Sequence, residues 1–239
     1  MTQPSAGPPD SGQVAFVTGA ASGIGAAVVT GLRSAGWTVG GFDLRPSQAD
    51  LSREGDVTDP AAVAAAAGDV TAGLGPIRAL VTAAGYYEMV PFGQISEEGW
   101  RRMLAVHLGG LVNAVRAVLP GMLGRRDGRI VAISSELAVG GGDGDAHYAA
   151  AKGAIIGFVR SLAAEVAGTG VLVNSVAPGP TDTPLLDPGS PWRAPDYLAT
   201  LPVGRLASPA EIAAAVRFVL GEGSFMVGEV LSVNSGAVI

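Results

Sequence analysis

The sequence "QVAFVTGAASGIG", residues 13–25, joins an apolar run to a glycine-rich turn and to the start of an Ala-rich stretch. The run of Val, Ala and Phe at 13–19 ends at glycine, which is typical of a buried strand. Gly19, Gly23 and Gly25 leave room for a phosphate close to the backbone, and a helix that begins here points free N–H groups at that phosphate. The stretch therefore predicts the strand–turn–helix unit of a nucleotide site. A purely structural turn is the alternative, because the chain holds 36 glycines.

Beyond this unit, apolar runs alternate with Ala-rich helical stretches. Such alternation predicts an α/β fold, a doubly wound parallel sheet with helices on both faces. The Pro/Gly-rich segment at 178–205 has no clear period and is expected to be a loop with short helical pieces. We expect one domain over 13–239 after a polar, disordered lead-in at 1–12. Further strands are expected at 37–43, 51–56, 77–85, 128–135, 171–179 and 229–234, and helices at 23–35, 60–74, 96–123, 146–167 and 208–220.

The composition excludes several classes of function. A net charge of −6 and a pI near 4.9 argue against nucleic acid or an anionic membrane as the main partner. The chain holds no cysteine, which removes disulfides, thiol catalysis and thiolate metal sites, and two histidines are too few for a histidine metal site. No stretch reaches the roughly 18 apolar residues of a membrane span, and the N-terminus lacks the pattern of a signal peptide. We expect a cytoplasmic protein without a metal centre.

An acidic residue lies at the end of the second expected strand. Asp43 follows Gly25 by 18 residues, and a carboxylate there can accept hydrogen bonds from the ribose hydroxyls of a dinucleotide. The same charge repels the additional phosphate of NADP, and Ser22 in the glycine turn adds no positive charge to offset it. Arg45 is the nearby cation that could accept that phosphate. We expect NAD as the cofactor, with NADP as the alternative.

Lys152 is the only lysine among the 15 Lys and Arg residues of the chain. It follows Tyr148 by four positions in an expected helix, so the two side chains lie on one helix face. An adjacent ammonium lowers the pKa of a phenol, typically by about 1–3 units from ~10, so that the phenol can exchange a proton near neutral pH. Lysine suits this task because its compact ammonium offers three donors, whereas arginine presents a planar fork. The same spacing also arises by chance on amphipathic helices.

Taken in chain order, these motifs resemble those of the short-chain dehydrogenase/reductase family. The resemblance covers nearly the whole chain from about residue 13. It implies a Rossmann-type fold, a nicotinamide cofactor, and hydride transfer between an alcohol and a ketone. The motifs are the glycine turn at 19–25, Ala83-Ala84-Gly85 after the fourth strand, Ser135, Tyr148-x-x-x-Lys152 and Pro178-Gly179.

The resemblance also implies roles for individual residues. Tyr148 would be the general acid/base, Lys152 would lower its pKa and bind the nicotinamide ribose, and Ser135 would hydrogen-bond the substrate oxygen. Ser134 is expected to be a strand residue. The implied cofactor contacts are Gly19, Ser22, Gly23, Ile24, Gly25, Asp43, Asp56, Val57, Ala84, Gly85, Tyr148, Lys152, Pro178, Gly179 and Thr183.

Two positions depart from the family pattern. His107 stands where the family normally has a catalytic asparagine that helps hold a proton-relay water near the lysine. Three interpretations stay open: the imidazole serves the relay, it fills space in a helix, or it marks a weakened enzyme. The fourth strand ends in Thr82-Ala83-Ala84-Gly85 rather than Asn-Asn-Ala-Gly, which we expect to alter sheet hydrogen bonds more than catalysis. His147, beside the tyrosine, is expected at the surface or in a subunit contact.

Specificity is expected to come from residues after Gly85, from the pair after Ser135, and from the 180–200 loop. These residues are mostly apolar and aromatic with one acid, which suits a small cyclic or aromatic alcohol or ketone. The resemblance implies a homo-oligomer, either a dimer or a tetramer. The alternatives are an NADPH-dependent ketoreductase of the same family and a catalytically weak nucleotide-binding regulatory or scaffold protein. The candidate substrate contacts are Tyr86, Tyr87, Met89, Glu136 and Leu137.

Overall fold

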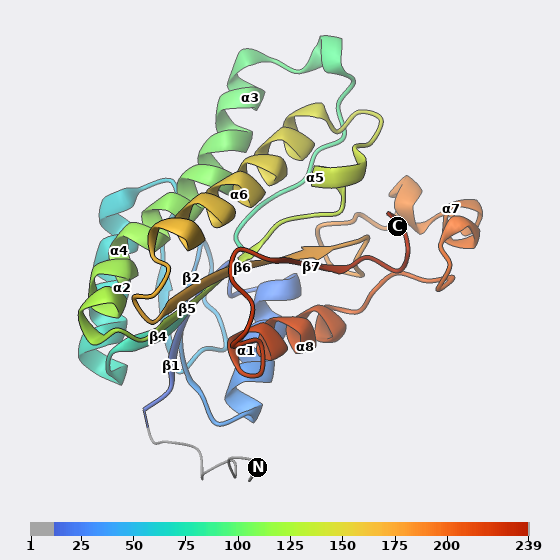
Figure 1. The fold of residues 1–239 in the computed structure, drawn as a ribbon. Coiled ribbons are helices and arrows are strands. Elements are labelled where there is room, and N and C mark those ends of the chain that lie inside the picture. The colour runs from blue at the N-terminus through green and yellow to red at the C-terminus, as the bar shows by residue number, and fades with distance from the viewer. Residues whose placement is uncertain (1–11, 239) are drawn as a thin grey trace, which may run out of the picture.

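The computed structural model describes residues 12–238, and its centre is a seven-stranded sheet in the order β3-β2-β1-β4-β5-β6-β7 (Figure 1). All neighbouring strands are parallel, so their carboxyl ends meet at one edge. This arrangement confirms the predicted α/β class. The strands are β1 (Val14–Thr18), β2 (Thr38–Asp43), β3 (Leu51–Glu54), β4 (Ile77–Thr82), β5 (Gly128–Ile133), β6 (Val171–Pro178) and β7 (Val230–Val233).

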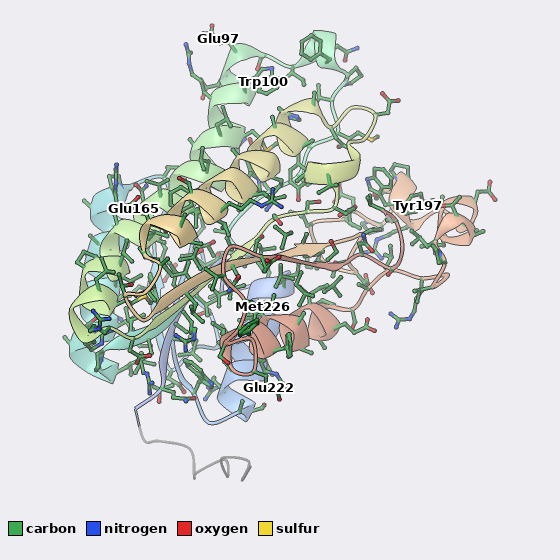
Figure 2. All side chains as sticks on the ribbon, in the orientation of Figure 1. Glu97, Trp100, Glu165, Tyr197, Glu222 and Met226 are labelled. Carbon is green, nitrogen blue, oxygen red and sulfur yellow. The ribbon has the colours of Figure 1, made fainter. Side chains whose placement is uncertain are left out.

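Helices cover both faces of the sheet (Figure 1). Helices α2 (Pro60–Leu74), α4 (Gly110–Arg125) and α6 (Ala146–Glu165) pack on one face, and α1 (Gly23–Ser34) and α8 (Pro209–Leu220) pack on the other. The pleat of the strands divides the core accordingly: in β1, Phe16 belongs to the first buried cluster and its neighbour Val17 to the second. Side chains fill the space between the sheet and both helical layers (Figure 2).

Local sequence signals explain where two of these helices begin. Asp59 caps α2 by accepting hydrogen bonds from the backbone amides of Ala61 and Ala62, and Pro60 occupies the first helical position. Helix α8 begins with a capping box, in which the Ser208 hydroxyl accepts from the Glu211 amide and the Glu211 carboxylate accepts from the Ser208 amide. The predicted helix at 60–74 is confirmed, and most other boundaries differ from the prediction by one to three residues.

The predicted continuous helix at 96–123 is wrong in one respect. It divides into α3 (Glu97–Leu104), a π-helical turn η2 (Ala105–Gly109) and α4. The apolar pattern of the helix does not reveal this turn, because the turn lies beside a contact with a residue distant in the sequence. Gly110 packs so closely on Val57 that an added Cβ would lie 2.9 Å from that side chain. The remaining short elements are η1 (Phe92–Gln94), α5 (Leu137–Gly140), η3 (Pro191–Arg193) and α7 (Pro195–Thr200).

The stretch Glu97–Arg125 is long and apolar enough to pass a length-and-composition test for a membrane span. Its apolar residues have another explanation, since Leu111, Val118 and Met122 are buried in the core against the sheet. The short helical pieces expected within 178–205 are present as η3 and α7. The predicted disordered lead-in falls, except for Gly12, outside the described residues.

Candidate active site

A cleft of about 560 Å³ opens at the carboxyl edge of the sheet. In an open parallel sheet this edge is the usual place for a ligand. The walls come from the turn between β1 and α1, from the ends of β2, β4, β5 and β6, from the start of α6, and from the segment after β6. One cavity therefore joins the glycine turn to the Tyr148 end of the site.

The glycine turn leaves no room for a side chain at Gly19 or at Gly25. A Cβ added to Gly25 would lie 1.9 Å from the carbonyl oxygen of Gly19, and one added to Gly19 would lie 2.5 Å from the backbone nitrogen of Ala84. Gly19 also has a φ of 71°, a conformation that favours glycine. Ser22, the N-cap of α1, makes no side-chain hydrogen bond to the first turn. The amides of that first turn can therefore bind an anionic group such as a pyrophosphate.

Asp43 links the end of β2 to the glycine turn. Its Oδ2 accepts a hydrogen bond of 3.0 Å from the Ala21 amide, and its Oδ1 accepts one of 3.2 Å from the Arg45 amide. Asp43, Leu44 and Arg45 all line the cleft. Asp43 thus has a structural role in addition to any contact with a ribose, because it holds the turn against the sheet.

Tyr148 and Lys152 are buried on one face of α6. The Lys152 ammonium lies 5.6 Å from the centre of the Tyr148 ring and donates a hydrogen bond of 2.9 Å to the carbonyl of Ile133 at the end of β5. Ser135 follows that strand by two residues and lines the same part of the cleft. Ser134 has a separate place, since its hydroxyl is hydrogen-bonded to Ser175 on β6 at 2.8 Å.

The pKa of Tyr148 corrects an expectation. Burial raises it well above the ordinary value of 10.0, and the charge of Glu136 raises it further. Burial also lowers the pKa of Lys152 to about 7. The downward shift predicted for the tyrosine is therefore wrong, because the phenolate is desolvated and the neighbouring lysine loses much of its charge near neutral pH.

His107 lies within the π turn and is buried against two tyrosines. Its Nε2 donates to the carbonyl of Tyr86 at 2.8 Å, because a carbonyl can only accept. Its ring stands perpendicular to that of Tyr148, with the centres 5.4 Å apart. Burial, and then the charge of Lys152, lower the pKa of His107 to about 3, so the ring is neutral at physiological pH. Its Nδ1 then presents a buried lone pair without a hydrogen-bond partner among residues 12–238.

Tyr87, Asp145 and Trp192 form a hydrogen-bonded group, and the first and last of them line the cleft. The Tyr87 hydroxyl donates to Asp145 Oδ1 at 2.7 Å and accepts from Trp192 Nε1 at 3.0 Å. Trp192 belongs to η3, and its ring contacts that of Tyr197 on α7 edge to face; Figure 2 shows Tyr197 on α7, apart from the helical layers. A second aromatic contact places the Arg102 guanidinium 4.7 Å from the centre of the Tyr86 ring.

The segment that carries Trp192 has its own internal contacts. At its base, Thr181 pairs with Ala207 in an isolated parallel bridge. Arg193 forms an ion pair of 2.8 Å with Asp182 and donates to the carbonyls of Thr183 and Leu186. These bonds pair the two ends of the segment with each other and join its N-terminal part to Arg193.

Glu136 is the buried acid of the cleft. The Ser135 hydroxyl donates to Glu136 Oε2 at 3.0 Å, and the Leu137 amide donates to Ser135 Oγ at 3.2 Å. Burial raises the pKa of Glu136 to about 7. A carboxyl group that changes charge near neutral pH therefore lies directly beside the serine.

The structure brings the predicted cofactor, substrate and catalytic residues to the walls of this one cleft, with one exception. Met89 is about half exposed and does not line it. The prediction that His147 lies at the surface or in a subunit contact is also wrong. It is buried at 1% exposure, and the centre of its ring lies 6.0 Å from that of Trp100. Sequence reasoning missed Trp192, Arg102 and Asp145, and only the position of Asp145 at the N-cap of α6 gave a signal.

Comparison with known proteins supports the same assignment. The short chain dehydrogenase family model matches residues 13–194. The 3-oxoacyl-acyl-carrier-protein reductase of Vibrio cholerae is 37% identical over 236 residues, which cover 94% of this chain and 97% of that protein. An acetoacetyl-CoA reductase of an Acinetobacter species is 36% identical and covers 94% of this chain and 97% of its own. The ligand-free aldohexose dehydrogenase of Thermoplasma acidophilum superimposes with a TM-score of 0.88 at 31% identity, over 94% of this chain and 93% of that one.

The family match, the Rossmann-like sheet and the glycine turn agree with one another. The chain belongs to the short-chain dehydrogenase family and is an oxidoreductase that acts on CH–OH groups with a nicotinamide cofactor.

Proposed function

We propose that this enzyme interconverts a secondary alcohol and a ketone on a small cyclic or aromatic substrate, with NAD as its cofactor. The observation that supports this most strongly is the convergence of Ser135, Tyr148 and Lys152 in the cleft that begins at the glycine turn. The aromatic side chains of Tyr86, Tyr87 and Trp192 line the same cleft. They offer flat apolar surface to a ring.

In this proposal the nicotinamide supplies the hydride in reduction and accepts it in oxidation. The Tyr148 hydroxyl donates its proton to the ketone oxygen during reduction, and its phenolate removes the hydroxyl proton during oxidation. Ser135 Oγ binds the same substrate oxygen. The raised pKa of Tyr148 keeps its proton in place at neutral pH, which favours the donor role.

The residues around the nucleotide end fit the cofactor. The first-turn amides of α1 would hold the pyrophosphate, and Asp43 would accept hydrogen bonds from the adenosine ribose. The carboxylate supports NAD over NADP because it would repel a ribose phosphate. Arg45 is exposed on the same edge of the cleft and supports NADP as the alternative.

Reduction of a 3-oxoacyl thioester is a second candidate activity. It is favoured by the names of the two reductases that are 37% and 36% identical to this chain. A sugar-like substrate is suggested by the aldohexose dehydrogenase with 31% identity. A panel that contains cyclic ketones, acetoacetyl-CoA and aldohexoses, each supplied with NAD(H) or NADP(H), separates these activities.

The chemistry is tested by Tyr148→Phe. Loss of the proton donor should lower kcat by about 10²–10⁴-fold while NADH binding, followed by fluorescence, stays nearly unchanged. Tyr197→Phe is the matched control, since Tyr197 lies outside the cleft lining and should keep full activity. Full activity in Tyr148→Phe would show that the acid/base assignment is wrong.

We also propose that the enzyme is a cytoplasmic homo-oligomer. Apolar side chains near the C-terminus support an interface: Phe225 is fully exposed, and Phe218 and Val227 are about half exposed. Light scattering on the purified protein would measure the assembly, and a monomer at micromolar concentration would contradict it.

A further inference from the structure

The hydrogen bonds of Ser135 leave its hydroxyl without a free proton. Ser135 Oγ accepts a hydrogen bond from the Leu137 amide and donates its single proton to Glu136 Oε2. A serine hydroxyl has one donor and two acceptor sites, and an ionised carboxylate can only accept. While Glu136 is ionised, Ser135 therefore retains one lone pair and has no proton to offer a substrate oxygen.

Ketone reduction needs the opposite arrangement. The ketone oxygen gains negative charge as hydride reaches the carbonyl carbon, so donors aimed at that oxygen lower the barrier. An ionised Glu136 accepts the hydrogen bond of the Ser135 hydroxyl and adds a negative charge beside the reacting oxygen. A protonated Glu136 can instead donate a hydrogen bond to Ser135 Oγ, which leaves the serine hydroxyl free to turn toward the substrate.

We propose that Glu136 is a positioning residue that decides, through its own proton, whether Ser135 donates a hydrogen bond to the substrate oxygen. The proposal rests on the alcohol/ketone activity proposed above. It predicts that the enzyme reduces ketones best when Glu136 is protonated and that the rate falls as the carboxyl ionises.

The surroundings of Glu136 place this change near neutral pH. Glu136 is buried at 8% exposure, and this burial raises its pKa to about 7, against the lowering effect of the Ser135 hydrogen bond. The other titratable groups of this region are the acid Asp145 before α6, the tyrosines Tyr87, Tyr148 and Tyr197, and the lysine Lys152 on α6. The pKa values of the tyrosines are raised, so none of them ionises near pH 7.

Lys152 is a confounding group, because its pKa is also about 7, and Asp145 is another, because burial raises the pKa of its carboxyl. Both residues are present in every variant, so any pH dependence that they cause is common to all of them. A difference between the wild type and Glu136→Gln then belongs to residue 136.

The first experiment measures kcat/KM for ketone reduction between pH 6 and pH 8. A single group with a pKa of about 7 predicts a fall of about ten-fold over this range for the wild type. Glu136→Gln cannot ionise at this position, so its fall over the same range should be about ten-fold smaller than that of the wild type, whatever Lys152 adds to both profiles. Asp143→Asn removes an exposed acid from the neighbouring loop without touching Ser135, and it should follow the wild type. The same profile in the wild type and in Glu136→Gln would overturn the proposal while leaving the alcohol/ketone activity intact.

A second measurement does not depend on turnover. The infrared C=O band of protonated Glu136, identified by its absence in Glu136→Gln, is titrated in the wild type and in Ser135→Ala. The serine hydroxyl stabilises the carboxylate, so the midpoint should move to higher pH when the hydroxyl is removed. An unchanged midpoint would overturn the coupling. If no ketone is turned over by any of the three proteins, the proposed activity fails, and this titration alone decides whether the two residues share a proton.

Discussion

The indole nitrogen of Trp192 donates a hydrogen bond of 3.0 Å to the hydroxyl of Tyr87, which lies 105 positions earlier in the chain. The bond ties the segment after β6 to the loop after β4, and both side chains line the cleft. Because the same hydroxyl donates to the buried Asp145, the segment is anchored to the N-terminal end of α6 as well.

Trp192→Phe should therefore weaken the attachment of the segment after β6 to Tyr87 without changing the chemistry. Loss of one hydrogen bond worth about 0.5–1.5 kcal/mol predicts a rise in the substrate KM of about two- to ten-fold, with kcat changed less. Trp37→Phe, at the opposite edge of the sheet, is the control and should leave both constants unchanged. A fall in kcat with an unchanged KM would contradict an anchoring role.

Asp43→Asn separates the charge of this residue from its structural hydrogen bond. The amide oxygen can still accept from the Ala21 amide, so the glycine turn should keep its shape. Removing the charge should lower the dissociation constant of NADPH relative to that of NADH by at least about ten-fold. Asp50→Asn, at a position that does not line the cleft, should not shift the ratio. Unchanged preference in Asp43→Asn, measured by fluorescence titration, would show that the carboxylate does not discriminate.

His107 is testable through the lone pair that its Nδ1 presents. If this atom holds a relay water, His107→Leu should lower kcat by about ten-fold, and His107→Asn, which restores a polar side chain, should stay within about three-fold of the wild type. Because the pKa of His107 is about 3, neither variant should change the pH profile between pH 6 and pH 9. Equal activity in both variants would mean that the imidazole only fills space.

Lys152 makes stability depend on pH with a defined sign. Its pKa is about 7 in the folded protein and has its ordinary value of 10.5 in an unfolded chain, so between these values the unfolded chain binds more protons. The free energy of unfolding should therefore rise from pH 7 toward pH 10, by at most a few kcal/mol from this group. Urea unfolding should find Lys152→Met more stable than the wild type at pH 7, and the difference should shrink as the pH rises. Arg160→Met, an exposed cation of the same helix, should give a constant difference. A constant difference for Lys152→Met as well would refute the lowered pKa.

Two glycines of α1 should respond to alanine in opposite ways. In Gly25→Ala the new Cβ would meet the Gly19 carbonyl oxygen at 1.9 Å, so the turn must open and NADH binding should be lost. In Gly31→Ala the nearest atom is 3.5 Å away, and a helix interior gains about 0.5–1 kcal/mol from the exchange. Thermal unfolding and NADH titration of both variants test the pair, and NADH binding by Gly25→Ala would contradict the tight turn.

The parts of the site that the sequence could predict are those fixed by local spacing. Gly19 to Gly25 form one turn and Tyr148 and Lys152 share one helix face, whatever surrounds them. Trp192 could not be found, because its partner Tyr87 is distant in the chain and its own segment has no regular period. The direction of the pKa shift of Tyr148 could not be predicted from the sequence either, because it depends on how deeply the ring and Lys152 are buried.

The segment between Thr181 and Ala207 is held together mainly by its own contacts. Its two ends are paired with each other, and Arg193 links its N-terminal part to η3. Trp192 bonds Tyr87, Thr181 bonds the Gly179 carbonyl, and Arg205 pairs with Glu211 on α8, so a few side chains join the segment to the rest of the protein. Helix α6, which carries Tyr148 and Lys152, and the glycine turn lie outside it. A library that varies this segment, while keeping Thr183, the Thr181–Ala207 pairing and the indole, could therefore alter which ring is accepted without rebuilding the machinery that moves the hydride.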